Sequence, residues 1–144
     1  MTKILVVGIA GRMGKTIAGC IEDTEGVDLG GGTELAGSEA IGKDIGEAAG
    51  VGNKGIMVMD DPAKAFEACD VAIDFTTPAS SISTLNAALK KGKSVIVGTT
   101  GFSPEQREEI AQFGKKIPCV VAPNMSIGVN VLFKVGCGCG AGVG

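Results

Sequence analysis

The chain is organised as a series of short apolar runs that are separated by segments with helical spacing. The first run, residues 3–7, shows no alternation of apolar and polar side chains, which is typical of a strand buried on both faces of a parallel sheet. Strands alternating with helices predict an α/β fold, a Rossmann-like, doubly wound parallel sheet in three layers and a single domain. Further strands are expected at residues 27–32, 56–59, 71–75, 94–97 and 117–122.

The expected helices carry start and stop signals. Asp61 followed by Pro62 predicts an N-cap with proline at the first helical position. The stretch SPEQ at residues 103–106 predicts a capping box. A helix that begins at Pro78 is expected to end at Gly92, with lysines in its last turn.

Composition narrows the function. Glycine provides 24 of the 144 residues, and the weakly patterned stretch 35–55 is expected to be a loop with at most a short helix. The net charge of −3 without a basic stripe, together with few aromatic residues, argues against a nucleic-acid partner. No apolar run approaches the roughly 18 residues that span a membrane, and the first run is too short for a signal peptide. The sequence therefore predicts a soluble, cytoplasmic chain with no membrane partner.

Cysteine and histidine usage limits the chemistry. The five cysteines are interpreted as free thiols, with Cys20, Cys69 and Cys119 as small core residues. Cys137 and Cys139 have no further ligands nearby, so no metal site is predicted. The absence of histidine removes the commonest general acid–base group. Chemistry must come from other side chains, a cofactor, or a part of the protein outside this sequence.

A glycine-rich turn, GIAGRMG at residues 8–14, lies between the first strand and the first helix. Such glycines let a pyrophosphate approach the backbone, and the helix N-terminus offers N–H groups and a positive dipole end. Glu34 follows Gly14 by 20 residues, where a carboxylate accepts hydrogen bonds from an adenosine ribose. Leu35 provides no cation for a 2′-phosphate, which modestly favours NAD over NADP, since Arg12 could still reach such a phosphate. A plain strand-to-helix turn and a solvated glutamate are the alternatives.

Two later strands end in DFTTP, residues 74–78, and GTTGF, residues 98–102. Ligands of open α/β sheets bind at this edge. The two glycines of GTTGF are expected to let the backbone approach a flat ring, which Thr99 and Thr100 can hydrogen-bond. An ordinary connection explains the same residues equally well. In APNMSIGVN, residues 122–130, Asn124 and Ser126 either fix a carboxamide or cap a helix.

The motifs VVGIAGRMG, DFTTP, GTTGF and APNMSIGVN, in this order and spacing, resemble the bacterial dihydrodipicolinate reductase (4-hydroxy-tetrahydrodipicolinate reductase) family of the diaminopimelate–lysine pathway. The resemblance covers residue 2 to about residue 133. It implies an N-terminal dinucleotide-binding domain and a C-terminal domain for substrate and tetramer formation. It also implies hydride transfer from NADH or NADPH to a cyclic dicarboxylate.

The resemblance assigns residues 8–13 to the pyrophosphate turn and Glu34 to the adenosine ribose. It places residues 98–100 and 122–125 around the nicotinamide. Together with the motifs themselves, this gives a candidate cofactor-binding set: Gly8, Ile9, Ala10, Gly11, Arg12, Met13, Gly14, Glu34, Phe75, Thr76, Gly98, Thr99, Thr100, Ala122, Pro123, Asn124 and Met125.

The family's catalytic segment, rich in histidine and with a substrate lysine, has no counterpart in this sequence. We therefore assign no catalytic residue and expect a chain that binds NAD or NADP, with NADH slightly favoured, without turnover. Residues 1–128 are predicted as the dinucleotide-binding domain and residues 129–144 as a hinge remnant with a disordered Gly/Cys-rich tail.

The alternative is a stand-alone NAD(P)-binding or sensing module with an ordered C-terminus. Truncation instead predicts exposed apolar surface. A homoserine-dehydrogenase-like reductase is disfavoured by the joint presence of GTTGF and APNMSIGVN. The oligomeric state of this chain stays open.

Overall fold

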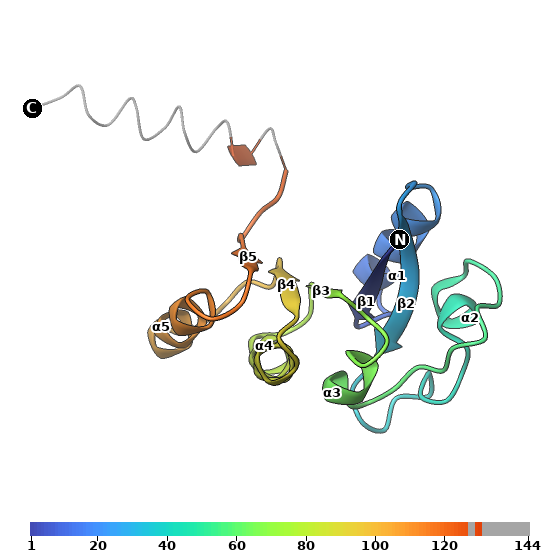
Figure 1. The fold of residues 1–144 in the computed structure, drawn as a ribbon, viewed down its shortest axis with the longest axis horizontal. Helices are drawn as coiled ribbons and strands as arrows, with labels where there is room; N and C mark the ends of the chain where they lie inside the picture. Colours follow the sequence, from blue (N-terminus) through green and yellow to red (C-terminus); the bar gives the residue numbers. More distant parts are fainter. Residues whose placement is uncertain (127–128, 131–144) are drawn as a thin grey trace, which may run out of the picture.

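In the computed structural model, which describes residues 1–126 and 129–130, five parallel strands form one sheet in the order β2-β1-β3-β4-β5 (Figure 1). The predicted α/β, Rossmann-like fold is confirmed. The strands are β1 (Thr2–Val7), β2 (Val27–Thr33), β3 (Val71–Asp74), β4 (Ser94–Val97) and β5 (Cys119–Val121). The helices are α1 (Arg12–Glu22), α2 (Ile45–Ala49), α3 (Pro62–Ala65), α4 (Pro78–Lys91) and α5 (Pro104–Phe113).

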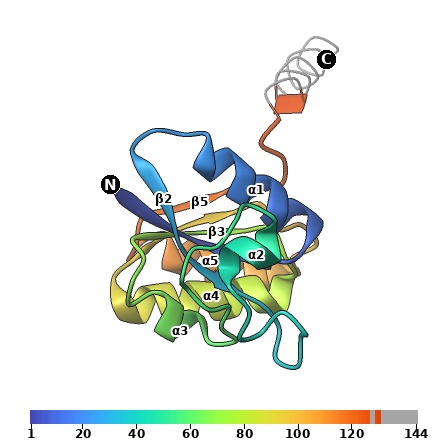
Figure 2. The same cartoon turned by 90° about the vertical axis from the view of Figure 1, so that its right-hand side faces the viewer.

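The helices cover the two faces of the sheet unequally. On one face α3, α4 and α5 bury Leu5 and Val7 of β1 together with Leu85 and Phe113 (Figures 1 and 2). On the other face α1 and α2 lie mainly over β1 and β2, with Val71 and Ile73 of β3 packed at the side of this core. Consecutive residues of β1 therefore point into two separate cores, which explains why the run at residues 3–7 is apolar without alternation.

The predicted helix boundaries are confirmed where the signals are local. The Asp61 side chain accepts a hydrogen bond from the N–H of Ala63 at the start of α3. Gly92 ends α4 with φ +63°, a conformation that favours glycine. Both reciprocal hydrogen bonds of the capping box at Ser103 and Gln106 are present, at 3.2 and 2.9 Å.

The predicted strand at residues 56–59 is wrong. This run forms only two isolated bridges, Met59 with Thr33 and Met57 with Asp44. The reason is that the backbone hydrogen bonds of this run are divided between two partners. Ile56 and Val58 bond to residues 42–45, whereas Met59 bonds to Gly32 and Glu34 at the end of β2. No continuous ladder with one strand therefore forms. The Asp44 carboxylate holds the chain that leads into the run, where it accepts hydrogen bonds from the N–H groups of residues 54, 55 and 56 at 2.9, 2.6 and 3.2 Å. The short α2 agrees with the loop predicted at residues 35–55.

The prediction for the cysteines holds only in part. Cys69 is fully buried, and burial raises the pKa of its thiol to about 11. Cys119 is half-buried, but Cys20 is exposed, so its assignment to the core is wrong. Cys20 lies on the side of α1 that overlooks β3 and β4, beyond the part of the sheet that α1 covers. Cys137 and Cys139 lie outside the described residues.

An apolar groove runs between α1 and the neighbouring face of β3 and β4. Met13 and Met125 at its rim are 47% and 40% exposed. Apolar surface is therefore exposed on this face, next to the edge strand β5. The side chains of the groove come from α1, the sheet and residue 125: Ile4, Met13, Thr16, Ile17, Cys20, Ile21, Thr24, Val27, Ile73, Phe75, Ile96 and Met125.

Among the described residues no helix is long and apolar enough to cross a bilayer.

Candidate functional site

A cleft opens where the strand order reverses, between the carboxyl ends of β1 and β3. The in-register pairing of Val7 with both Thr33 and Asp74 brings the ends of β1, β2 and β3 to one edge. Open α/β sheets bind their ligands at such a switch point. The cleft measures about 560 Å³, and most of its lining belongs to the predicted cofactor set: Gly8, Gly11, Arg12, Met13, Gly14, Thr16, Glu34, Phe75, Thr76 and Thr77.

The glycine turn has the geometry that close approach of a ligand requires. Gly8 adopts φ +73°, in the region that favours glycine. A Cβ at Gly14 would overlap the carbonyl oxygen of Gly8, so only glycine lets α1 pack this closely on the turn. Gly11 is the N-cap of α1 and provides no side-chain cap. The first-turn N–H groups, which have no intrahelical partner, therefore remain available to an anion at the cleft.

Glu34 lies half-buried beside this turn, as predicted for a ribose-binding acid. Its Oε1 accepts a hydrogen bond of 2.8 Å from the N–H of Ala10. The carbonyl of Thr33 accepts hydrogen bonds from the N–H groups of Gly8 and Ile9, at 2.8 and 3.1 Å. Among the described residues Oε2 has no hydrogen-bond partner. The end of β2 is thus attached to the turn, with one carboxylate oxygen available to a ligand.

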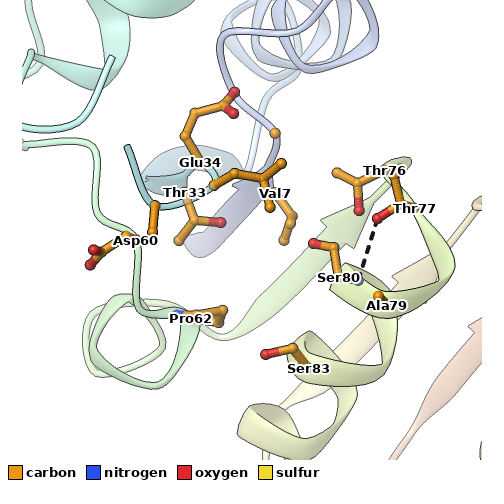
Figure 3. A pocket seen from close by; sticks show the side chains of 13 residues that line it. Val7, Thr33, Glu34, Asp60, Pro62, Thr76, Thr77, Ala79, Ser80 and Ser83 are labelled. Atoms are coloured by element: carbon orange, nitrogen blue, oxygen red, sulfur yellow. Dashed lines mark hydrogen bonds between the residues drawn. The ribbon is translucent and has the colours of Figure 1, made fainter. Parts of the chain in front are cut away.

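A second cleft of about 360 Å³ adjoins the first and shares Gly8, Glu34, Thr76 and Thr77 with it. Figure 3 shows Glu34 and Asp60 on one side of this cleft, with the start of α4 opposite. The other residues that line this cleft were not in the candidate set: Val7, Thr33, Leu35, Ala36, Asp60, Pro62, Thr77, Ala79, Ser80 and Ser83. For the residues of α4, the sequence offered one signal: the predicted helix start at Pro78, at the end of DFTTP, which places the first turn of that helix at the same edge of the sheet.

A buried set of hydrogen bonds joins the loops that follow β3 and β4. We call Asp74, Thr76, Ser81 and Thr99 the Asp74 cluster. Asp74 Oδ1 accepts from the N–H and the hydroxyl of Thr76, at 3.0 and 2.6 Å, and from the Thr99 hydroxyl at 3.3 Å. Thr99 Oγ1 in turn accepts from the Thr76 N–H at 3.0 Å and from the Ser81 hydroxyl at 2.7 Å. Thr99 is therefore fully engaged inside the protein.

The glycines of GTTGF have structural reasons in this fold. A Cβ at Gly98 would overlap the ring of Phe75, so the flat ring beside Gly98 belongs to the protein itself. Gly101 adopts φ +87°, which favours glycine. Thr99 and Thr100 line a third hollow, with Phe102, Arg107 and Pro123 among its other residues. The predicted contact of this loop with a cofactor ring stays a prediction.

The segment after β5 is held by hydrogen bonds of Asn124, and whether Asn124 and Ser126 fix a carboxamide or cap a helix stays a prediction. Asn124 Oδ1 accepts from the N–H of Ser126 at 2.8 Å, and its carbonyl accepts from Asn130 Nδ2 at 2.8 Å. Met125 lines the apolar groove.

Ile9 of the candidate cofactor set is fully buried in the core, so only its backbone belongs to the glycine turn. Within the described part of the chain no three Asp, Glu, Cys or His residues are grouped as metal ligands.

Comparison with known proteins places this geometry in context. The family model described as "Dihydrodipicolinate reductase, N-terminus" matches residues 2–125. The chain is 46% identical over 135 residues to the 4-hydroxy-tetrahydrodipicolinate reductase of Citrifermentans bemidjiense, covering 94% of this chain and 51% of that protein. The corresponding reductase of Chromohalobacter salexigens is 43% identical, with 94% and 50% covered. The chain thus spans about half the length of the curated relatives it matches.

Solved structures show the same fold at low sequence identity. A dipicolinate-bound dihydrodipicolinate reductase from Paenisporosarcina sp. TG-14 superimposes with a TM-score of 0.73 at 22% identity, covering 94% of this chain and 52% of that one. An amine dehydrogenase from Mycobacterium smegmatis gives a TM-score of 0.67 at 23% identity, with 83% and 38% covered. These likenesses concern the fold alone.

Proposed function

The chain belongs to the dihydrodipicolinate reductase family, whose N-terminal part it matches, and from this premise we propose that it is the dinucleotide-binding half of such a reductase. The observation that carries the proposal is the position of Glu34. Its carboxylate is held against the glycine turn, at the N-terminus of α1 and at the point where the strand order reverses. Residues 1–128 form the proposed dinucleotide-binding domain.

The residues of the two clefts fit the parts of NAD(P)H. The first-turn N–H groups of α1 and the adjacent Arg12 favour a pyrophosphate. Glu34 Oε2 suits the diol of a ribose, and the 360 Å³ cleft beside it has the size of a small-ligand pocket for the adenosine. The nicotinamide is proposed to lie toward Phe75, Thr76, Gly98, Thr99, Thr100 and residues 122–125. When bound, the cofactor supplies the hydride.

The charges in the adenosine cleft favour NADH over NADPH. Glu34 and Asp60 both line this cleft, and a 2′-phosphate placed between them would add a third negative charge. Leu35, which is 68% exposed, offers no compensating cation at the position after the acid. Arg12 lines the adjoining cleft instead. NADH is therefore the proposed preference.

For the whole protein we propose the reduction of 4-hydroxy-tetrahydrodipicolinate to tetrahydrodipicolinate, the reaction of its relatives, by hydride transfer from the nicotinamide. The present sequence has no histidine and supplies none of the family's histidine-rich catalytic segment. Its own contribution to that reaction is to bind and orient the cofactor. Substrate binding and assembly into tetramers belong to the same proposal for the whole protein.

Calorimetric titration of this chain with NADH and NADPH tests the proposal. We expect saturable binding, tighter for NADH. Glu34→Ala is expected to raise the dissociation constant for NADH about 10- to 100-fold, because hydrogen bonds to a charged group contribute about 1.5–3 kcal/mol. Glu39→Ala, an exposed glutamate in the following loop, is the control and should bind as the parent chain does. Absence of binding to both nucleotides, or equal affinity in Glu34→Ala, would contradict the proposal.

A further inference from the structure

Asp74 occupies a position where the fold by itself favours an apolar residue. Its neighbours in register, Val7 on β1 and Val97 on β4, are buried apolar residues on the same face. Asp74 is fully buried, forms no ion pair with any described residue, and its Oδ2 has no hydrogen-bond partner among them. A buried, unpaired carboxyl is costly to stability. Such local conflicts with the rules of folding concentrate at functional sites.

What Asp74 does is join two loops. Its Oδ1 holds both the backbone and the hydroxyl of Thr76, and it holds Thr99 through the hydroxyl of that residue. Thr76 in turn lies over the glycine turn, since its Cγ2 is 2.8 Å from the place a Cβ of Gly8 would take. One carboxylate thus positions the loops after β3 and β4, and Thr76 also lies against the glycine turn. The hydroxyl of Ser81, near the start of α4, donates a hydrogen bond to Thr99 Oγ1.

The anchoring of Glu34 is separate from this arrangement. Glu34 is held by the N–H of Ala10, and its own N–H donates to the carbonyl of Met59 at 2.9 Å. None of the hydrogen bonds of the Asp74 cluster involves these residues. The hydrogen bonds that hold Glu34 are therefore distinct from those of the Asp74 cluster, although Thr76 of the cluster also lines the 360 Å³ cleft.

We propose that Asp74 is a positioning residue, which through Thr76 and Thr99 holds the loops after β3 and β4 in the geometry that receives the nicotinamide half of the dinucleotide. This inference rests on the proposed function. Asp74 and Ser81 act through the threonines, because both are fully buried and line neither of the two clefts. Their removal should weaken the nicotinamide half of the site more than the adenosine half, where Glu34 keeps its own hydrogen bonds.

Two ligands that differ only in the nicotinamide ring, NADH and ADP-ribose, test this in the 144-residue chain. Asp74→Asn replaces the carboxyl that accepts three hydrogen bonds by an amide, and Ser81→Ala removes a buried hydroxyl that lines neither cleft. We expect Asp74→Asn to raise the dissociation constant for NADH about tenfold and Ser81→Ala about threefold, with ADP-ribose changed less than about twofold. The fluorescence gain of NADH on binding should fall in the same order.

Thr84→Val is the matched control. Thr84 is a fully buried hydroxyl on α4 that bonds only the carbonyl of Ser80, at 3.1 Å, outside the cluster. It should change neither dissociation constant. Equal weakening of NADH and ADP-ribose, or no weakening of either in chains that melt cooperatively, would overturn the positioning role. If Asp74→Asn does not fold, Ser81→Ala decides the question. A parent chain that binds neither ligand would instead overturn the proposed function and this inference with it.

Discussion

Two glycines of α1 occupy opposite environments. A Cβ at Gly14 would overlap the carbonyl oxygen of Gly8 and approach the Cα of Ile9 to 2.8 Å. A Cβ at Gly19, five residues along the same helix, would meet nothing within 4 Å. The first glycine is required by the packing of α1 on the turn, whereas the second only weakens the helix.

Alanine substitutions should therefore shift stability in opposite directions. We expect Gly14→Ala to lower the free energy of unfolding by about 1–3 kcal/mol, the usual cost of overpacking. Gly19→Ala should raise it by about 0.5–1 kcal/mol through helix propensity. Urea denaturation followed by circular dichroism measures both. A common sign for the two variants would contradict this account of the turn.

At this scale the sequence was informative where spacing is local. The glycine turn and Glu34 follow one another along the chain, so their roles could be predicted before the fold was known. Asp60 and Ser80 reach the same cleft only because the strands adopt the order 2-1-3-4-5, which no local pattern encodes. Asp74 belongs to the DFTTP motif, but the motif does not predict that its side chain is fully buried. That burial depends on the helices that cover this face of the sheet.

The elements show the same division between local and distant causes. The start of α4 at Pro78, its end at Gly92 and the capping box at Ser103 were all predicted. Each of these signals lies within a few residues of the structure that it determines. The run at residues 56–59 was predicted as a strand because its side chains are apolar. Its backbone hydrogen bonds are instead divided between residues 42–45 and the end of β2, an arrangement that apolar patterning does not reveal.

Asp44 should make the stability of this loop depend on pH. Burial raises the pKa of its carboxyl, but four backbone N–H donors outweigh this and hold the pKa below the ordinary value of 3.8. The ionised form is therefore favoured by folding. Its contribution is fully present above pH about 3.8 and declines as the pH falls below that value toward the folded-state pKa.

Thermal unfolding between pH 5 and pH 3 measures this contribution. The melting temperature of the parent chain should exceed that of Asp44→Asn at pH 5, and the difference should narrow toward pH 3. Asp23→Asn, a change at the exposed C-cap of α1, is the control and should follow the parent curve. A difference between the parent chain and Asp44→Asn that stays constant over this range would show that the carboxylate charge is not what matters.

At the scale of the whole molecule, no described strand pairs with the outer side of β5, which forms one edge of the sheet. At the other edge, Thr33 of β2 forms a bridge with Met59. β5 is the outermost strand on the side of the apolar groove, and its Val120 and Val121 are 57% and 40% exposed. Edge strands with apolar side chains pair readily with further chains, and lysine is a usual protection. Self-association of this chain is therefore expected to proceed through β5 and the adjoining groove.

Val120→Lys tests that expectation. Sedimentation velocity over a range of concentrations should show weaker self-association in this variant, with little change in melting temperature because the side chain is already exposed. Met57→Lys, which replaces an equally exposed apolar residue at 56% away from β5, should associate as the parent does. Equal association in all three chains would exclude the β5 edge as the contact.

The central place of β1 in the strand order has a consequence for synthesis. β1 pairs with β2 and with β3, and its partner on the second side begins only at Val71. At roughly 5–20 residues per second, β3 leaves the ribosome about 3–13 s after β1. During that time β1 has one unpaired edge, and Leu5 and Val7 lack most of their eventual neighbours, which follow Val71 in the chain. A nascent chain of this kind is a natural client for chaperones that shield apolar strands until the later half of the sheet arrives.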